Sequence, residues 1–204
     1  MNKKVHKFQV VGGNFDKELS YYKANFGREY LEQVLEKKDY KKSLKMGQAN
    51  IDYKKIGIKR NSRGYIDPVK MPTLEKLRKL LGWKNTQMII MKYEQGEIQL
   101  RHIDHMPDYD IAERKELYVK ANEFKNPEYH RMLLMLNDRK PGQFMHIEDK
   151  IINSWKQGDM FYYNSKEVYH GAGNCGNEPR WILRITGIPT KKFENFKKKK
   201  IIKL

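Results

Sequence analysis

The feature that most constrains the fold of this chain is a change in its pattern near residue 87. From there to residue 188, short segments rich in Ile, Leu, Met, Phe and Tyr are separated by Gly, Pro, Asn and Asp, which are typical of turns. Short strands at such close spacing predict an all-β sandwich or jelly roll, the cupin-like double-stranded β-helix among them. The expected strands are 88–93, 98–103, 132–136, 143–147, 151–155, 160–163, 168–170 and 181–188, with 94–97 as a hairpin turn between the first two.

The first 86 residues have a different pattern, in which apolar residues recur at three- and four-residue steps between 16 and 45 and between 74 and 81. This spacing is typical of helices. We expect Thr73 to cap the second helix and Gly82 to end it, with a loop over 47–70. The chain is thus predicted to be a single domain, 1–204, mainly β with N-terminal helices. It divides into helical support (1–86), a jelly-roll core (87–190) and a basic tail (191–204), which we expect to be solvated and frayed.

Composition excludes several classes of protein. The chain is 39% hydrophobic, so it has enough apolar side chains for a core and is not intrinsically disordered. It has no apolar run near the roughly 20 residues that cross a membrane. Its basic N-terminus has no apolar stretch behind it, so we expect no signal peptide. The single cysteine, Cys175, excludes an internal disulfide and favours a reducing compartment, so we expect a cytoplasmic location.

The formal net charge of +17 has two interpretations. A strongly basic protein attracts nucleic acid or another anionic surface. The alternative is codon bias, because Lys, Ile, Asn and Tyr share A/T-rich codons and are all plentiful here. The lysines are spread along the chain rather than clustered, which favours the second interpretation. Nucleic acid therefore stays a candidate partner but not the favoured one.

The main candidate site is the tripeptide His102-Ile103-Asp104 at the end of an expected strand. Alternate residues of a strand face the same side, so His102 and Asp104 project together, about 6–7 Å apart along the backbone. Two histidines and one carboxylate on one face of an octahedron form the usual non-haem iron(II) site. A His-x-Asp tripeptide also occurs by chance, so its interpretation depends on the rest of the chain.

Supporting residues lie in the C-terminal third. A Gly158-Asp159 turn precedes an apolar segment, His170 follows among small residues, and Arg180 stands ten positions later. With Tyr93 and Gly96 ahead of His102, the region from about 88 to 188 resembles the 2-oxoglutarate/iron(II) dioxygenase superfamily. The likeness is greatest to its prolyl-4-hydroxylase-like branch, phage-encoded relatives included. The resemblance implies that His102, Asp104 and His170 bind the catalytic iron.

The resemblance also implies how 2-oxoglutarate is held. Arg180 corresponds to the residue that binds the distal carboxylate, and a guanidinium fork suits this task. Arg184 is the alternative, because Arg180, Arg184 and Thr186 share one face of the last strand. Tyr93 corresponds to a tyrosine that hydrogen-bonds the co-substrate in some relatives, and Thr186 is a further candidate near the site.

The implied activity is a 2-oxoglutarate- and iron(II)-dependent hydroxylase. Such an enzyme couples oxidation of a C–H bond by O2 to decarboxylation of 2-oxoglutarate to succinate and CO2, and ascorbate can serve as an accessory cofactor. Peptidyl proline, an amino acid or a nucleobase are candidate substrates, and the polar insert 105–129 is a candidate lid. Two other functions stay open: a basic nucleic-acid-binding module without catalysis, and a zinc hydrolase using the same His/Asp/His set.

Overall fold

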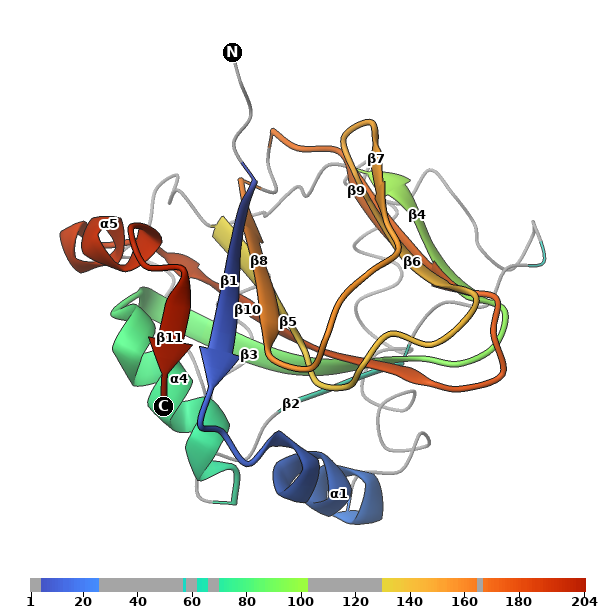
Figure 1. The fold of residues 1–204 in the computed structure, drawn as a ribbon, viewed down its shortest axis with the longest axis horizontal. Helices are drawn as coiled ribbons and strands as arrows, with labels where there is room; N and C mark the ends of the chain where they lie inside the picture. Colours follow the sequence, from blue (N-terminus) through green and yellow to red (C-terminus); the bar gives the residue numbers. More distant parts are fainter. Residues whose placement is uncertain (1–4, 26–56, 58–61, 66–69, 103–129, 165–166) are drawn as a thin grey trace, which may run out of the picture.

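The computed structural model describes residues 5–25, 57, 62–65, 70–102, 130–164 and 167–204 of the chain. They form two β-sheets and three helices (Figure 1). The larger sheet has the order β11-β1-β8-β5-β10-β3-β2, and the smaller one has the order β4-β9-β6-β7. The strands of the larger sheet are β1 (His6–Val11), β2 (Ser62–Tyr65), β3 (Lys84–Tyr93), β5 (His130–Met135), β8 (Asp159–Tyr163), β10 (Arg180–Ile188) and β11 (Ile201–Lys203). Those of the smaller sheet are β4 (Glu97–His102), β6 (Gln143–Ile147), β7 (Lys150–Ile152) and β9 (His170–Asn174).

From β3 onward the chain passes back and forth between the two sheets. Strands β3, β5, β8 and β10 lie together in the larger sheet, while β4, β6, β7 and β9 make up the smaller one. Every pairing among these eight strands is antiparallel. This is the double-stranded β-helix, so the predicted jelly roll is confirmed.

The larger sheet separates two hydrophobic cores. Alternate residues of β10 point to opposite sides of it: Leu183 and Ile185 pack into the outer core, and Ile182 packs into the inner one. The inner core lies between the sheets, with Met91 from β3 and Met145 from β6. Because both faces of β10 are covered, its side chains are buried from Arg180 to Gly187. The even-numbered residues of β10 therefore face the barrel interior.

The turn at 94–97 does not form the expected hairpin. Strands β3 and β4 flank it but belong to different sheets. Gly96 adopts a left-handed conformation, with φ of 78°, and its N–H donates to the Asn174 carbonyl at 2.8 Å. The local sequence predicted a turn correctly, but which strand pairs with which is decided by long-range contacts. Here those contacts bring β4 onto β9 and β3 onto β10.

Strand β9 begins where the sequence predicted a strand to end. We expected a turn of small residues after His170, but His170–Asn174 is a buried strand between β4 and β6. Its glycines are required by close packing rather than by a bend. A Cβ at Gly171 would lie 2.8 Å from the Gln99 carbonyl oxygen, and one at Gly173 would lie 2.7 Å from the Phe144 ring.

The two ends of the chain also differ from expectation. The N-terminal segment contributes β1 and β2 to the larger sheet, and the C-terminal segment forms helix α5 (Lys191–Lys197) and strand β11, which pairs with β1 in parallel. The tail is therefore not frayed: Phe193, Phe196 and Ile202 are buried in the outer core. Apolar residues spaced among the lysines outweigh the charge that suggested a solvated end.

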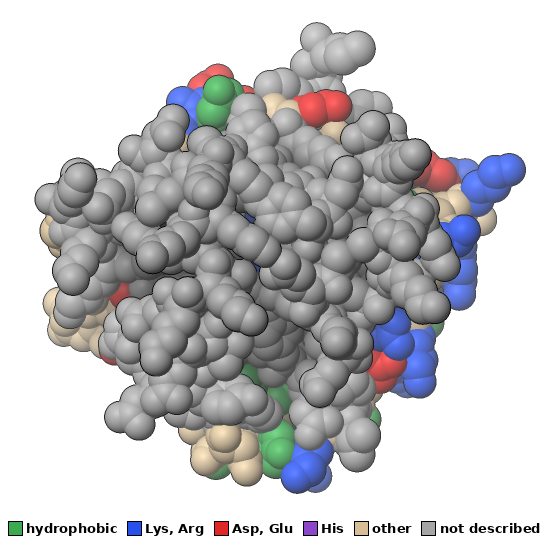
Figure 2. All heavy atoms as spheres, turned by 180° about the vertical axis from the view of Figure 1, so that it is seen from behind, with side chains coloured by type: hydrophobic (Ala, Val, Ile, Leu, Met, Phe, Trp, Pro, Cys, Tyr) green, Lys and Arg blue, Asp and Glu red, His purple; other side chains and the backbone are tan. Residues whose placement is uncertain are grey.

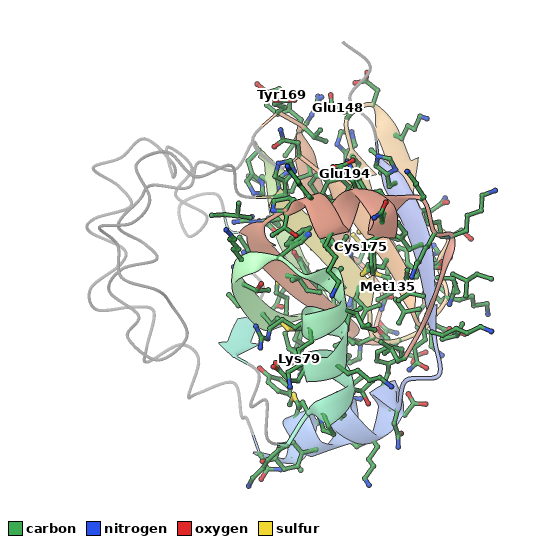
Figure 3. The ribbon with its side chains drawn as sticks, turned by 90° about the vertical axis from the view of Figure 1, so that its left-hand side faces the viewer. Lys79, Met135, Glu148, Tyr169, Cys175 and Glu194 are labelled. Atoms are coloured by element: carbon green, nitrogen blue, oxygen red, sulfur yellow. The ribbon has the colours of Figure 1, made fainter. Side chains whose placement is uncertain are left out.

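Helices α1 (Phe15–Asn25), α4 (Pro72–Leu81) and α5 pack on the outer face of the larger sheet, where Figure 3 shows α4 and α5 in front of the strands. Gly82 ends α4 in a left-handed conformation, as predicted, but Thr73 is not its cap. The Glu18 carboxylate from α1 instead accepts the backbone N–H of Thr73 at 2.5 Å and of Leu74 at 3.1 Å. The expected helix over 16–45 is described only to Asn25. In the described part of the chain no helix is long and apolar enough to cross a membrane.

Candidate functional site

Two of the three predicted iron ligands come together on the smaller sheet. His102, at the end of β4, is the cross-strand partner of His170, at the start of β9, and their ring centroids are 4.4 Å apart. A register shift between Gln99 and His102 turns the end of β4 so that this pairing forms. Residues 68 positions apart in the chain thus become neighbours, because β4 and β9 pair in the folded sheet.

The two imidazoles are oriented in the same way. Nδ1 of His102 bonds to the Leu100 carbonyl at 2.7 Å, and Nδ1 of His170 bonds to the Val168 carbonyl at 3.0 Å. A carbonyl can only accept, so both Nδ1 atoms carry the proton and both Nε2 atoms carry the lone pair. This is the tautomer that metal-binding histidines need, and backbone carbonyls are common partners for the other ring nitrogen.

The third predicted ligand, Asp104, lies outside the described residues, as does the candidate lid 105–129. No group of three His, Cys, Asp or Glu side chains in the described segments forms a metal site. The two described members of the predicted triad are therefore the histidines, and Asp104 stays a prediction from the sequence, two residues beyond the end of β4.

Arg180 lies at the start of β10 with its side chain completely buried. Its guanidinium carbon is 5.1 Å from the Tyr93 ring centroid and 4.9 Å from that of Trp155, so two aromatic rings flank the cation. Nη1 donates to the Phe144 carbonyl at 3.0 Å, whereas Nε and Nη2 have no hydrogen-bond partner among the described residues. Burial lowers the pKa of Arg180 to about 10, so the group stays cationic at neutral pH.

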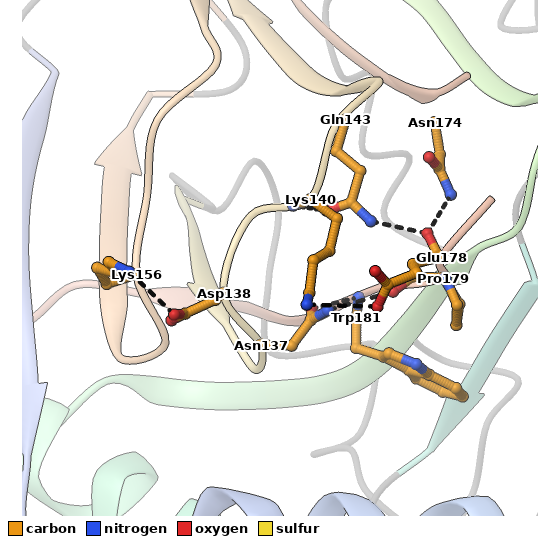
Figure 4. Close-up of polar contacts among 9 residues, drawn as sticks. All are labelled: Asn137, Asp138, Lys140, Gln143, Lys156, Asn174, Glu178, Pro179 and Trp181. Atoms are coloured by element: carbon orange, nitrogen blue, oxygen red, sulfur yellow. Dashed lines mark hydrogen bonds and ion pairs between the residues drawn. The ribbon is translucent and has the colours of Figure 1, made fainter. Parts of the chain in front are cut away.

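A polar network holds the start of β10 in place (Figure 4). The Asn137 side chain accepts the Trp181 N–H at 2.9 Å and donates to the Pro179 carbonyl at 3.2 Å, so it grips the backbone on both sides of Arg180. Asn174 and Gln143 both donate to the Glu178 carbonyl at 2.8 Å. Asn174 therefore acts on the backbone at this end of the barrel.

Tyr93 connects the arginine with the histidines. It is the cross-strand partner of Arg180, and its hydroxyl donates to Gln99 Oε1 at 2.8 Å. The Gln99 amide nitrogen lies 3.0 Å from Nε2 of His102, to which it donates. The resemblance predicted Tyr93 near the co-substrate site, but it did not single out Gln99.

Several of these residues line a cavity between the two sheets. Its lining includes Tyr93, Gln99, His170 and Arg184, together with apolar side chains from both sheets (Met91, Leu133, Met145, Ile147 and Ile182). Of the three β10 residues predicted to share one face, Arg184 lines the cavity, and so does Ile182 two residues before it. Thr186 is buried two residues further along, beyond the described lining.

Two aromatic residues of the site were missed in the sequence. The Tyr163 ring lines the cavity with its centroid 5.1 Å from that of His170, and Trp155 stacks on Arg180. Phe161 and Tyr163 alternate on β8 and both pack in the inner core. That alternation was the available signal, but it does not distinguish a core aromatic from one beside a site.

Comparisons with known structures show which proteins share this fold. A prolyl-4-hydroxylase from Pseudomonas putida aligns over 93% of this chain and 94% of its own, with a TM-score of 0.53 and 12% identity. The non-haem α-ketoglutarate-dependent epimerase SnoN of nogalamycin biosynthesis aligns over 92% of this chain and 78% of its own, with a TM-score of 0.52 and 10% identity. The chain has the fold of these oxygenases. In sequence, no protein-family model and no curated protein matches it.

Within this oxygenase fold, the described surface carries mixed charge. Figure 2 shows Lys and Arg side chains along one edge of the visible face, with Asp and Glu side chains among them. Elsewhere among the described residues, ion pairs such as Arg78–Glu75 and Lys197–Glu194 (2.7 Å) also place opposite charges side by side. Tyr169 and Glu148 lie at the same end of the barrel (Figure 3), where the Tyr169 N–H donates to the Glu148 carboxylate at 3.1 Å.

Proposed function

We propose that this protein is a 2-oxoglutarate- and iron(II)-dependent dioxygenase that hydroxylates an unactivated C–H bond. The observation that carries the proposal is the combination of two features beside a cavity whose lining includes His170 and Tyr93. His102 and His170 approach each other with Nδ1 of each ring bound to a backbone carbonyl, and two buried donors of Arg180 have no hydrogen-bond partner among the described residues. A metal ion would bind the two histidines, and an anionic chelator on that metal would accept hydrogen bonds from Arg180.

The residues present fit the two absent groups. His102, His170 and Asp104 would hold iron, since two imidazoles and a carboxylate are the donor set that ferrous oxygenases use. Nε and Nη2 lie on one edge of the Arg180 guanidinium and match the two oxygens of a carboxylate. A buried cation with unsatisfied donors is costly unless an anion binds it. The distal carboxylate of 2-oxoglutarate would satisfy both donors, with Tyr93 beside it.

When bound, iron with 2-oxoglutarate supplies the oxidising power, with O2 as co-substrate and ascorbate as an accessory reductant. The chain's own contribution is orientation and exclusion of water. The Leu100 and Val168 carbonyls hold the imidazoles in place, and the asparagine network around β10 holds Arg180. Met91, Met145, Ile147 and Ile182 form the apolar part of the cavity wall, which strengthens charge interactions beside it.

Substrate identity is the finer part of the proposal. Peptidyl proline is one candidate, since the P. putida structure is that of a prolyl-4-hydroxylase. A free amino acid and a nucleobase are the others. A cytoplasmic location is proposed from the single cysteine. Nucleic acid is not favoured as a partner, because the basic charge is distributed over the chain.

The decisive experiment is anaerobic addition of iron(II) and then 2-oxoglutarate to the purified protein. We expect a visible metal-to-ligand charge-transfer band that is absent with either component alone. It should also be absent in His102→Ala and Asp104→Ala, and admission of O2 should release succinate. Asp149→Ala is a matched control, because that carboxylate is 96% exposed.

Two outcomes would contradict the proposal. Tight zinc binding with no band in the iron form would favour a zinc hydrolase. Steeply salt-dependent binding of nucleic acid without consumption of 2-oxoglutarate would favour a binding module.

A further inference from the structure

Trp155 packs against Arg180 in the inner core and carries an unused hydrogen-bond donor. Its ring centroid is 4.9 Å from the Arg180 guanidinium carbon, and only 4% of the residue is exposed. Its indole Nε1 is buried and has no hydrogen-bond partner in the described part of the chain. The same holds there for Nε and Nη2 of Arg180. Two stacked side chains therefore contribute three buried donors that lack an acceptor.

The other two tryptophans show what is particular about Trp155. Nε1 of Trp83 and Nε1 of Trp181 are also buried without a partner among the described residues, but both rings pack in the outer core. A buried indole N–H usually finds an acceptor, yet its lack of one does not identify a site. Trp155 differs because the cation beside it also has donors to satisfy. An anion at this place would satisfy both side chains.

Tyr93, the other ring beside the guanidinium, does not offer an equivalent donor. Its centroid is 5.1 Å from the guanidinium carbon, and its hydroxyl donates to Gln99 Oε1 at 2.8 Å. A phenol has a single O–H, so this hydrogen bond uses it. Of the two rings that flank Arg180, Trp155 is therefore the one with a donor hydrogen left for a ligand.

The backbone on both sides of the Trp155 ring is fixed before any ligand binds. The Trp155 carbonyl accepts the Arg139 N–H at 3.3 Å. The next residue, Lys156, donates its N–H to the Asp159 carboxylate at 3.0 Å, and its side chain bonds Asp138 at 3.1 Å (Figure 4). A donor held in place in this way loses little freedom when a ligand binds, so more of its hydrogen-bond energy contributes to affinity.

Building on the proposed function, we propose that the Trp155 indole N–H is a further donor to the distal carboxylate of 2-oxoglutarate. Arg180 supplies the charge and two hydrogen bonds, and Trp155 supplies another from a neutral group. A carboxylate has room for several donors on its two oxygens, and hydrogen bonds to an ionised acceptor are the strong ones. Trp155 is thus a specificity residue, which favours a 2-oxo acid with a second carboxylate over one that ends in an alkyl group.

Trp155→Phe tests the donor, because phenylalanine keeps an aromatic ring beside Arg180 but has no N–H. The full-length protein is loaded anaerobically with iron(II), and the charge-transfer band is titrated with 2-oxoglutarate and with 2-oxopentanoate, which has the same carbon chain without the distal carboxylate. We expect Trp155→Phe to bind 2-oxoglutarate about tenfold or more weakly, as loss of a hydrogen bond to a charged group predicts. Its affinity for 2-oxopentanoate should stay that of the native protein.

Trp83→Phe is the matched control for this substitution. It also removes a buried indole N–H without a partner among the described residues, but from the outer core. It should bind both acids as the native protein does.

A second measurement does not depend on the folding of Trp155→Phe. The chain has three tryptophans, so the isotope-labelled native protein gives three indole N–H signals in a nitrogen–proton NMR spectrum. Trp83→Phe and Trp181→Phe identify the Trp155 signal by elimination. With zinc(II) as a diamagnetic substitute for iron, 2-oxoglutarate should move that signal downfield, as formation of a hydrogen bond does, and 2-oxopentanoate should not.

The inference is overturned if Trp155→Phe binds 2-oxoglutarate as tightly as the native protein, if Trp83→Phe weakens binding equally, or if the Trp155 signal stays in place when 2-oxoglutarate saturates the site. Equal losses for both acids in Trp155→Phe would also overturn it, because Trp155 would then act on packing and not on the distal carboxylate. Any of these results with a charge-transfer band in the native protein removes this inference alone, whereas absence of the band removes the proposed function.

Discussion

Tyr93 and Arg180 are direct cross-strand partners on β3 and β10, and the guanidinium carbon lies 5.1 Å from the centroid of the phenol ring. Tyr93 also connects Arg180 to the histidines, because its hydroxyl hydrogen-bonds Gln99 and the Gln99 amide hydrogen-bonds His102. Tyr163 lies next to the second histidine, with its ring centroid 5.1 Å from that of His170. The proposed co-substrate site and the histidine pair are therefore parts of one connected structure.

Replacing Arg180 with methionine should abolish binding of 2-oxoglutarate without lowering the stability of the ligand-free protein. Burial lowers the pKa of Arg180 to about 10, well below its ordinary value, and at about 1.4 kcal/mol per pKa unit the buried charge costs on the order of 3 kcal/mol. The ligand-free Arg180→Met protein should thus be at least as stable as the native one in urea unfolding. It should lose the rise in Tm that 2-oxoglutarate produces in the metal-loaded native protein. An undiminished rise would contradict the role given to Arg180.

His170→Ala should abolish metal binding, because it removes one of the two imidazoles that approach each other in the fold. Equilibrium dialysis with cobalt(II) as a spectroscopic substitute for iron measures this directly. His130→Ala is the matched control: His130 bonds the Tyr162 hydroxyl at 2.8 Å, and Tyr162 packs in the outer core. If His130→Ala lost metal as completely as His170→Ala, the site would be misplaced.

Gln99→Leu should raise metal affinity. The Gln99 amide donates to His102 Nε2 at 3.0 Å, and a metal must displace that hydrogen bond. A typical net hydrogen bond is worth about 0.5–1.5 kcal/mol, so affinity should rise by up to about tenfold. The same dialysis measurement detects the change. A fall in affinity would show that Gln99 supports the metal-bound form instead.

Gly171→Ala should weaken both the fold and the metal site. Its Cβ would lie 2.8 Å from the Gln99 carbonyl oxygen on β4, and backbone cannot yield as a side chain can. Strands β4 and β9 would separate, moving His102 from His170. We expect a loss of about 2 kcal/mol in the free energy of unfolding, with reduced cobalt affinity. Ala172→Ser, at the neighbouring buried position, serves as a comparison; equal metal affinity in Gly171→Ala and the native chain would refute the argument.

Several parts of the fold could be read from local pattern. The strands 143–147 and 160–163 were placed within one residue of β6 and β8, because alternation and flanking turn residues act over short distances. Helix α4 ended at Gly82 as predicted. The strand expected over 168–170 instead begins at His170, because a glycine required by a neighbouring strand looks the same in sequence as a glycine in a turn.

The sequence alone was sufficient to indicate a jelly roll, a histidine pair and an arginine on the inner face of the last strand, since each depends on strand periodicity and on a resemblance along the chain. It could not decide the pairing of β4 with β9, the Tyr93–Gln99–His102 hydrogen bonds or the stacking of Trp155 on Arg180. Those contacts join residues that are brought together only when two sheets pack face to face. Their energies depend on burial and distance, which a linear pattern does not contain.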